Sequence, residues 1–159
     1  MGEDRWSEVE YADWLARKGG SIIAIPKGPK FFTVPGEPIA KPRQTRSDKW
    51  KERPCVVRYR EWADRAREHA GAIPPAAQRA DIVAYLPLPA SWSQRKRNKM
   101  AGMPHQQKPD IDNLIKSALD ALLSRDQGIH EIRAKKRWAD ANGPRVEITI
   151  YGFSNTSLL

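Results

Sequence analysis

The most strongly patterned part of the chain is a helix expected between Ile111 and Leu123. Apolar side chains recur there at spacings of three and four residues and form one broad face: Ile111, Leu114, Ile115, Ala118, Leu119 and Leu122. A helix with such a face packs against a core, and a chain of 159 residues is long enough for one core but not for two. The pattern therefore indicates a small single domain.

Four short segments rich in β-branched and aromatic residues are expected to be strands: 31–34, 80–86, 129–138 and 145–151. The second of them is apolar on both faces, which favours an interior strand. Another helix is expected to start near Pro54 and to end at Gly71, with a buried face made of Tyr59, Trp62, Ala63, Ala66 and Ala70. The order β-α-β-α-β-β predicts an α+β fold, a mixed sheet with packed helices.

The domain is expected to cover residues 29–153, followed by a C-terminal tail at 154–159. Residues 1–28 are expected to add a helical extension, because they contain a capping box and a narrow apolar stripe. Trp6 and Trp14 of this extension are candidates for a dimer interface or for a partner surface.

The chain is strongly basic, since 28 Lys and Arg against 19 Asp and Glu give a formal net charge of +9. A surplus this large in a small domain favours a polyanionic partner, because binding releases the partner's counterions. Basic residues gather in 41–60 and in 91–108, and the second range contains no acid and has the composition of a mobile surface loop. We expect phosphate contacts to such a partner from Lys41, Arg43, Arg46, Arg95, Lys96, Arg97, Lys99 and Lys108.

Other features narrow the class of protein. Cys55 is the only cysteine, which excludes an intrachain disulfide and a cysteine-based zinc site. No apolar run approaches the roughly 20 residues that span a bilayer, and the N-terminus lacks a signal-peptide core, so we expect a cytoplasmic protein without a membrane segment. His105 and His130 lack metal-ligand spacing and are expected to be exposed, whereas Trp62 and Trp138 fit core positions.

An acidic segment opens the first helix described above. Asp110 and Asp112 lie two residues apart, so both can turn oxygens toward one hard cation, and Mg²⁺ accepts such sparse carboxylate ligation together with water and phosphate oxygens. Asp112, Lys116 and Asp120 share one helix face, and Asp120 is expected to pair with Lys116. A purely structural interpretation makes one aspartate an N-cap. A calcium loop is excluded, because Ile115 stands where an EF-hand requires glycine.

The same segment resembles the signature of the RusA family of Holliday-junction resolvases: Lys108-Pro-Asp-Ile-Asp-Asn-Leu-Ile-Lys-Ser-Ala-Leu-Asp-Ala-Leu122. Three further stretches resemble the family's first strand, its basic stretch and its last strand: Phe32-Thr-Val-Pro-Gly-Glu-Pro-Ile-Ala-Lys41, Pro87-Leu-Pro-Ala-Ser-Trp-Ser-Gln-Arg-Lys-Arg97 and Pro144-Arg-Val-Glu-Ile-Thr-Ile150. The resemblance covers about residues 30 to 152.

The resemblance implies roles for individual residues. Asp110 and Asp112 match the two aspartates that bind the catalytic metal, and Lys116 matches a lysine essential for cleavage. Asp126 matches a further metal-site aspartate, because Ile129 keeps the hydrophobic position three residues later. Asp120 matches a recurring position that is not catalytic.

The chain departs from the family pattern after the helix. Family members usually carry two adjacent aspartates there, after a longer turn, whereas this chain has Arg125 before Asp126. The third metal ligand is therefore open, with Asp120 and Glu131 as alternatives to Asp126.

The expected function is Mg²⁺-dependent hydrolysis of branched DNA, in recombination and repair, with Mn²⁺ as a substitute ion and no small-molecule cofactor. Two symmetric nicks resolve a four-way junction and one chain offers one acidic cluster, so we expect a homodimer, which the resemblance also implies. The alternatives are a metal-dependent nuclease for other branched or flap DNA, and a non-catalytic basic DNA-binding protein.

Overall fold

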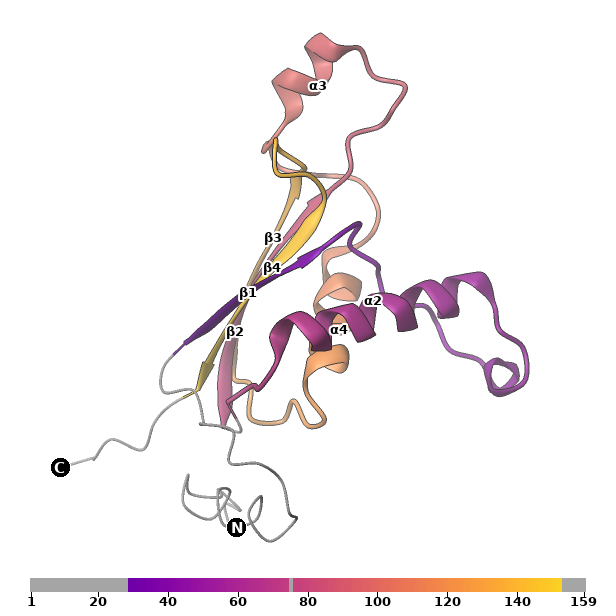
Figure 1. Cartoon of the computed structure of the whole chain (residues 1–159), viewed down its shortest axis with the longest axis vertical. Helices are drawn as coiled ribbons and strands as arrows, with labels where there is room; N and C mark the ends of the chain where they lie inside the picture. Colours follow the sequence, from indigo (N-terminus) through magenta and orange to yellow (C-terminus); the bar gives the residue numbers. More distant parts are fainter. Residues whose placement is uncertain (1–28, 75, 153–159) are drawn as a thin grey trace, which may run out of the picture.

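Four strands form one mixed sheet in the computed structural model, which describes residues 29–74 and 76–152. The strands are β1 (Lys30–Pro35), β2 (Ala77–Leu86), β3 (Glu131–Trp138) and β4 (Arg145–Gly152). Their order across the sheet is β1-β4-β2-β3, with β2 and β3 parallel and the other neighbours antiparallel (Figure 1). The predicted α+β fold with a mixed sheet is confirmed, and β2 is the interior strand that was predicted.

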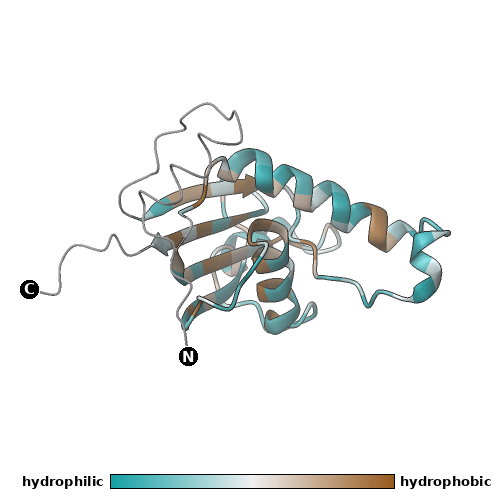
Figure 2. Ribbon diagram, turned by 90° about the horizontal axis from the view of Figure 1, so that it is seen from below, coloured by the Kyte–Doolittle hydropathy of each residue, from teal (hydrophilic) through white to brown (hydrophobic). Residues whose placement is uncertain are grey.

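Two helices cover one face of this sheet: α2 (Pro54–Ala70) and α4 (Ile111–Leu122). Pro54 occupies the first turn of α2, where the N–H that it lacks would have no helical partner. Gly71 ends the helix with a positive φ of 58°. The five residues predicted to form the buried face of α2 are all buried. Figure 2 shows hydrophilic and hydrophobic stretches alternating along the helix ribbons, as expected for helices with one buried face.

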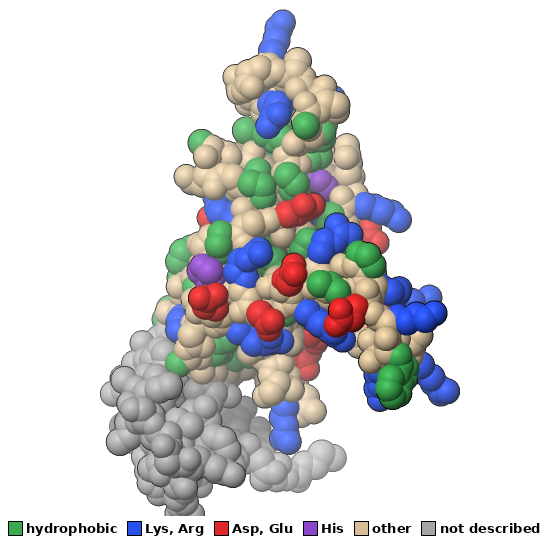
Figure 3. Space-filling model, turned by 45° about the vertical axis from the view of Figure 1, so that its right-hand side comes forward, with side chains coloured by type: hydrophobic (Ala, Val, Ile, Leu, Met, Phe, Trp, Pro, Cys, Tyr) green, Lys and Arg blue, Asp and Glu red, His purple; other side chains and the backbone are tan. Residues whose placement is uncertain are grey.

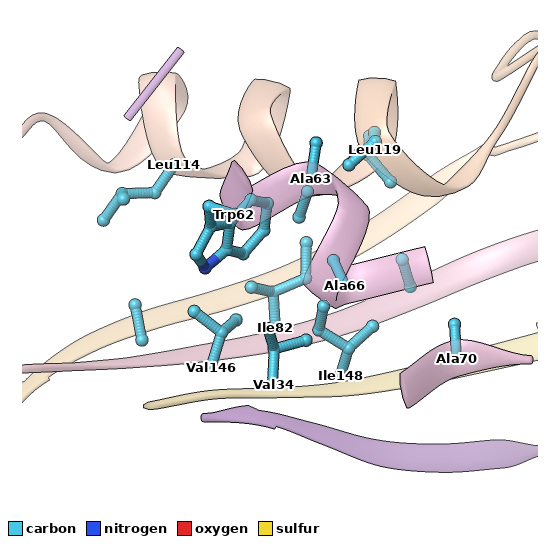
Figure 4. Packing of buried hydrophobic residues seen from close by; sticks show 14 of the residues in the cluster. Val34, Trp62, Ala63, Ala66, Ala70, Ile82, Leu114, Leu119, Val146 and Ile148 are labelled. Carbon is cyan, nitrogen blue, oxygen red and sulfur yellow. The ribbon is translucent and has the colours of Figure 1, made fainter. Parts of the chain in front are cut away.

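The core lies between the sheet and these two helices (Figure 4). Ile82 of β2 and Ile148 of β4 point toward Trp62 of α2 and Leu114 of α4, and all four side chains are buried. Most of the predicted apolar face of α4 packs in or against this core. Ile111 is the exception, with 39 % of its surface exposed, because it is the first residue of the helix and precedes the turns that pack on the sheet.

The structure corrects two details of the strands. Residues of β2 alternate between buried and partly exposed positions, so one face is buried and the other carries polar residues such as Asp81. This outer face is not covered by α2 or α4. β3 begins at Glu131 rather than at Ile129, because Ile129 belongs to the preceding turn and donates its backbone N–H to Asp126 at 3.0 Å.

The basic range 91–108, predicted to be a mobile loop, contains a further helix, α3 (Gln94–Met100). The hydroxyl of Ser93 caps it by accepting a backbone hydrogen bond from the first turn at 3.3 Å. Trp92 packs against Trp138 of β3, with 4.8 Å between the ring centroids. Residues 92–102, called the arm below, therefore form an ordered projection at the end of the sheet, at the top of Figure 1.

A short 3-10 helix, η1 (Arg46–Lys49), precedes α2. Within the described ranges, no helix is long and apolar enough to cross a membrane. The expected N-terminal helix with Trp6 and Trp14, and the expected C-terminal tail, lie outside these ranges.

Candidate functional site

Asp110 and Asp112 lie on the surface at the start of α4. Asp110 is the N-cap residue, yet its side chain accepts no capping hydrogen bond. Asp112 lies in the first turn, where the partial positive charge of the helix N-terminus stabilises a carboxylate. The structural interpretation of the pair, as a helix cap, is therefore not supported by the contacts of Asp110.

Most other aspartates of the described ranges are ion-paired. In residues 29–74 and 76–152, five aspartates each contact a lysine or an arginine: Asp48, Asp64, Asp81, Asp120 and Asp140. Asp110, Asp112 and Asp126 contact no basic side chain within the same ranges. In the described part of the chain, the three aspartates without a basic partner are thus the three that were predicted to bind a metal ion.

The residues just before Asp110 are fixed to β3. Backbone hydrogen bonds of 2.9 to 3.0 Å join the two segments, from Gly102 to Trp138, from Trp138 to Met103 and from His105 to Lys136. Lys136 then donates from its Nζ to the carbonyl oxygens of Gln107, at 2.6 Å, and of Pro109, at 2.7 Å. The partly buried Lys136 therefore holds the turn that leads into the acidic pair.

The segment that follows β1 holds the first turns of α4 from another direction. The buried Ser117 donates its hydroxyl to the carbonyl oxygen of Ile39 at 2.6 Å. The backbone N–H of Lys41 donates to the carbonyl oxygen of Asn113 at 3.3 Å. Two neighbouring segments thus fix the backbone that carries the carboxylates.

Sequence reasoning did not identify Lys136. Arg133, Lys135 and Arg137 alternate along β3, so Lys136 lies on the opposite face together with the buried Trp138. A lysine on the buried face of a strand needs acceptors for its ammonium group. A lysine at an inward-facing position of a strand was therefore the feature of the sequence that could have identified Lys136.

The expected pairing of Asp120 with Lys116 is wrong. Asp120 forms an ion pair with Lys41 instead, and this hydrogen bond raises the pKa of Lys41. Lys116 is exposed and contacts no acidic side chain among the described residues. Its ammonium group is therefore available to a ligand beside Asp112, whereas Asp120 is already neutralised.

Asp126 lies beyond the other end of α4. The helix has 12 residues and at about 1.5 Å per residue it separates the two ends by about 18 Å. Glu131, the other alternative, pairs with Arg79 and Arg133. Accordingly, no group of three or more Asp, Glu, His or Cys side chains in the described part of the chain is placed to hold a metal ion. One chain brings Asp110 and Asp112 together but does not bring Asp126 to them.

The basic residues predicted to bind DNA lie mainly on two projections, the arm and the segment around η1. Six of the eight are exposed: Arg43, Arg46, Arg95, Lys96, Lys99 and Lys108. Lys41 and Arg97 are partly buried, and the ammonium group of Lys96 lies 4.2 Å from the ring centroid of Trp92. Figure 3 shows basic side chains at the upper end of the molecule and on the projection at its right.

His105, predicted to be exposed, is buried. Its ring packs on Trp138 with 4.1 Å between the centroids. Burial lowers the pKa of His105, and the positive charge of Lys136 lowers it further. The neutral ring is thus favoured, and His105 joins Trp92 and Trp138 in an aromatic cluster at the base of the arm.

A carboxylate pair on the surface, flanked by basic projections, is typical of an enzyme that acts on the backbone of a nucleic acid. The comparison with family models names the family, because residues 35–151 match the endodeoxyribonuclease RusA. This match covers most of the chain, so the chain belongs to the RusA endodeoxyribonuclease family, as its motifs predicted. No curated protein matches the chain. Membership makes the protein a nuclease of a family that acts on Holliday junctions.

Proposed function

We propose that the protein resolves four-way DNA junctions by two symmetric, Mg²⁺-dependent nicks, in recombination and repair. The observation that carries the proposal is the exposed pair Asp110 and Asp112, which has no basic partner among the described residues and lies close to Lys108 and Lys116 in the sequence. Membership of the RusA family supports branched DNA as the substrate.

The test is a gel assay of a synthetic four-way junction beside a linear duplex of equal length, with and without Mg²⁺. We expect paired nicks in the junction that require Mg²⁺, and no cutting of the duplex. Preferred cutting of a flap substrate would indicate a nuclease with another branch preference. Binding without cutting would indicate a non-catalytic DNA-binding protein.

The donor set at the start of α4 fits Mg²⁺, with Mn²⁺ as a substitute. Asp110 and Asp112 offer hard carboxylate oxygens, which Mg²⁺ prefers, and these two residues would hold the ion. The nearby His105 is buried and packed on Trp138, so its ring is committed elsewhere. When bound, the ion would supply Lewis-acid chemistry by acidifying water and offsetting charge on the phosphoryl group.

The basic side chains around the pair would position the DNA. Lys116 lies one turn along α4 from Asp112, and its exposed side chain can offset negative charge on the scissile phosphate or the leaving oxygen. Lys108 is exposed two residues before Asp110 and would contact the phosphate backbone beside it.

We propose a homodimer, because two symmetric nicks need two acidic sites and one chain has one carboxylate pair. The dimer also bears on Asp126. Since α4 separates this residue from Asp110 and Asp112 within a chain, its proposed role as third metal ligand requires that the partner chain supplies it. We make that arrangement part of the proposal.

Neutralising the arm should weaken DNA binding. The variant replaces Arg95, Lys96, Arg97 and Lys99 with glutamine, and we expect lower affinity for junction and duplex alike, because these residues would bind phosphates rather than bases. For every phosphate that the variant no longer neutralises, the log–log salt slope should fall by roughly 0.9. The slope is measured by titration at several salt concentrations, and an unchanged slope would show that the arm does not face the DNA.

Removing the ammonium group of Lys136 should lower the cleavage rate. Lys136→Met keeps the apolar stem but leaves the carbonyl oxygens of Gln107 and Pro109 without a donor, so the acidic pair loses its fixed position. We expect the cleavage rate to fall about ten- to a hundredfold, as for residues that orient metal ligands. The Mg²⁺ requirement, defined as the concentration that gives half-maximal rate, should rise. Both are measured with saturating junction.

Lys135→Met is the matched control, because Lys135 lies next to Lys136 in β3 but is exposed. This variant should keep the wild-type Mg²⁺ requirement. A folded Lys136→Met variant with unchanged rate and Mg²⁺ requirement would show that the turn keeps its geometry without the ammonium group.

A further inference from the structure

Trp50 is the most exposed of the large hydrophobic residues in the described ranges, with 88 % of its surface accessible. It directly follows η1 in the segment between β1 and α2, which projects beyond the N-terminal end of α2 at the right of Figure 1. An indole this exposed contributes nothing to the core. Large apolar groups that a fold leaves in solvent are commonly binding sites.

The turn that carries Trp50 is well fixed. The buried Asp48 accepts hydrogen bonds from Arg53 at 2.5 and 2.7 Å and from the backbone N–H of Thr45 at 2.6 Å. These bonds, above all those from Arg53, hold the pKa of Asp48 well below its usual range. The backbone N–H of Trp50 donates to the carbonyl oxygen of Ser47 at 3.0 Å. These hydrogen bonds therefore fix the backbone that carries the indole.

The surroundings of this turn are basic. Its exposed cationic side chains are Arg43, Arg46, Lys49 and Lys51. Of the two acids nearby, Asp48 is neutralised by Arg53, and the exposed Glu52 leaves the four cations in excess. A second copy of the chain would bring the same positive charges to this turn, so self-association here is disfavoured, and a polyanion is the partner that the charge fits.

The segment also begins beside the acidic pair. The backbone of Lys41 is hydrogen-bonded to Asn113 in the first turn of α4, and nine residues further on the chain reaches Trp50. A DNA strand held at the carboxylates can therefore extend along this segment. An aromatic ring among cations suits unpaired nucleotides, because the cations hold the phosphates while a base stacks on the ring.

We propose that Trp50 stacks on a base at the branch point of the DNA, where the continuous stack of base pairs is interrupted. This inference rests on the proposed action on branched DNA, and it assigns to Trp50 a part in distinguishing a branch from a continuous duplex. In a duplex each base is already stacked and paired, and extracting it is costly. At a branch the stacking is interrupted and in a bulge a nucleotide is unpaired, so a base is available at lower cost. Trp50 should thus strengthen binding to branched DNA and leave duplex binding unchanged.

The experiment compares wild type with Trp50→Ala and Trp50→Phe, without Mg²⁺ to prevent cleavage. Three probes are titrated by fluorescence anisotropy: a four-way junction, a duplex with a bulge of unpaired nucleotides, and the matching continuous duplex. We expect Trp50→Ala to weaken binding to the junction and the bulged duplex about tenfold, which is within the range for loss of one stacked base. Trp50→Phe should retain most of the affinity, and duplex binding should be the same for all three proteins.

Phe31→Ala is the matched control, because Phe31 is also an exposed aromatic residue, at 63 %, but lies on the outer face of β1. It should bind all three probes as wild type does. An equal loss of affinity for all three probes in Trp50→Ala, or no loss, would overturn the stacking proposal. A lower sedimentation coefficient of Trp50→Ala than of wild type would also overturn it, because Trp50 would then contact a second copy of the chain. If wild type binds the junction no more tightly than the continuous duplex, the proposed junction resolution is contradicted. Binding to the bulged duplex then tests the role of Trp50 by itself.

Discussion

Replacing Asp110 or Asp112 with asparagine should abolish junction cleavage while leaving junction binding intact or tighter. Each change removes a carboxylate from the exposed pair at the start of α4, and with it the charge that would hold the metal ion. The same change reduces the repulsion between the protein and phosphate. We expect the single-turnover rate with Mg²⁺ to fall by at least about a hundredfold, and binding is measured separately without metal.

Asp120→Asn is the matched control on the same helix. Asp120 is paired with Lys41 and lies at the other end of α4 from Asp110, so this variant should keep most of the cleavage activity. Near wild-type cutting by Asp110→Asn or Asp112→Asn would show that the metal ion is held elsewhere. Loss of activity in Asp120→Asn alone would make Asp120 the third ligand.

Two inactive variants should restore nicking when their chains are mixed. If the partner chain supplies Asp126, a dimer of one Asp112→Asn chain and one Asp126→Asn chain has one intact site and one site with both defects. Equal mixing gives about half mixed dimers by chance, so roughly a quarter of the wild-type nicking is expected. The product should be a nicked junction rather than a resolved one, because each mixed dimer cuts one strand.

The same mixture distinguishes the alternatives. If all ligands came from one chain, each site in a mixed dimer would carry one defect and no activity would return. Chain exchange is verified by pulling down one tagged chain with the other. Activity of the Asp126→Asn variant by itself would remove Asp126 from the metal site and leave Asp120 and Glu131 as the alternatives.

The elements that could be predicted from the sequence are those with local signals. The apolar spacing of α4 and the strict alternation of β4 identify each element without reference to any neighbour. Pro54 and Gly71 mark the two ends of α2, because their backbone preferences act at the residue itself. The acidic pair was predictable for the same reason, since the two aspartates lie two residues apart.

The features that escaped prediction depend on contacts between distant segments. α3 has no apolar stripe, and its seven residues are ordered by Ser93 and by the packing of Trp92 on Trp138. The hydrogen bonds of Lys136 and the pairing of Asp120 with Lys41 also join distant parts of the chain. Residue patterns within one segment carry no information about such partners.

Both ends of the arm meet at one residue. Trp92 packs on the ring of Trp138, and the backbone N–H of Gly102 donates to the carbonyl oxygen of the same residue at 3.0 Å. The intervening residues form a closed insertion, whereas the carboxylates are held further along by Lys136. The length and charge of the insertion can therefore change without moving the metal-binding groups. Evolution or protein engineering can thus alter the DNA contacts of the arm independently of the cleavage site.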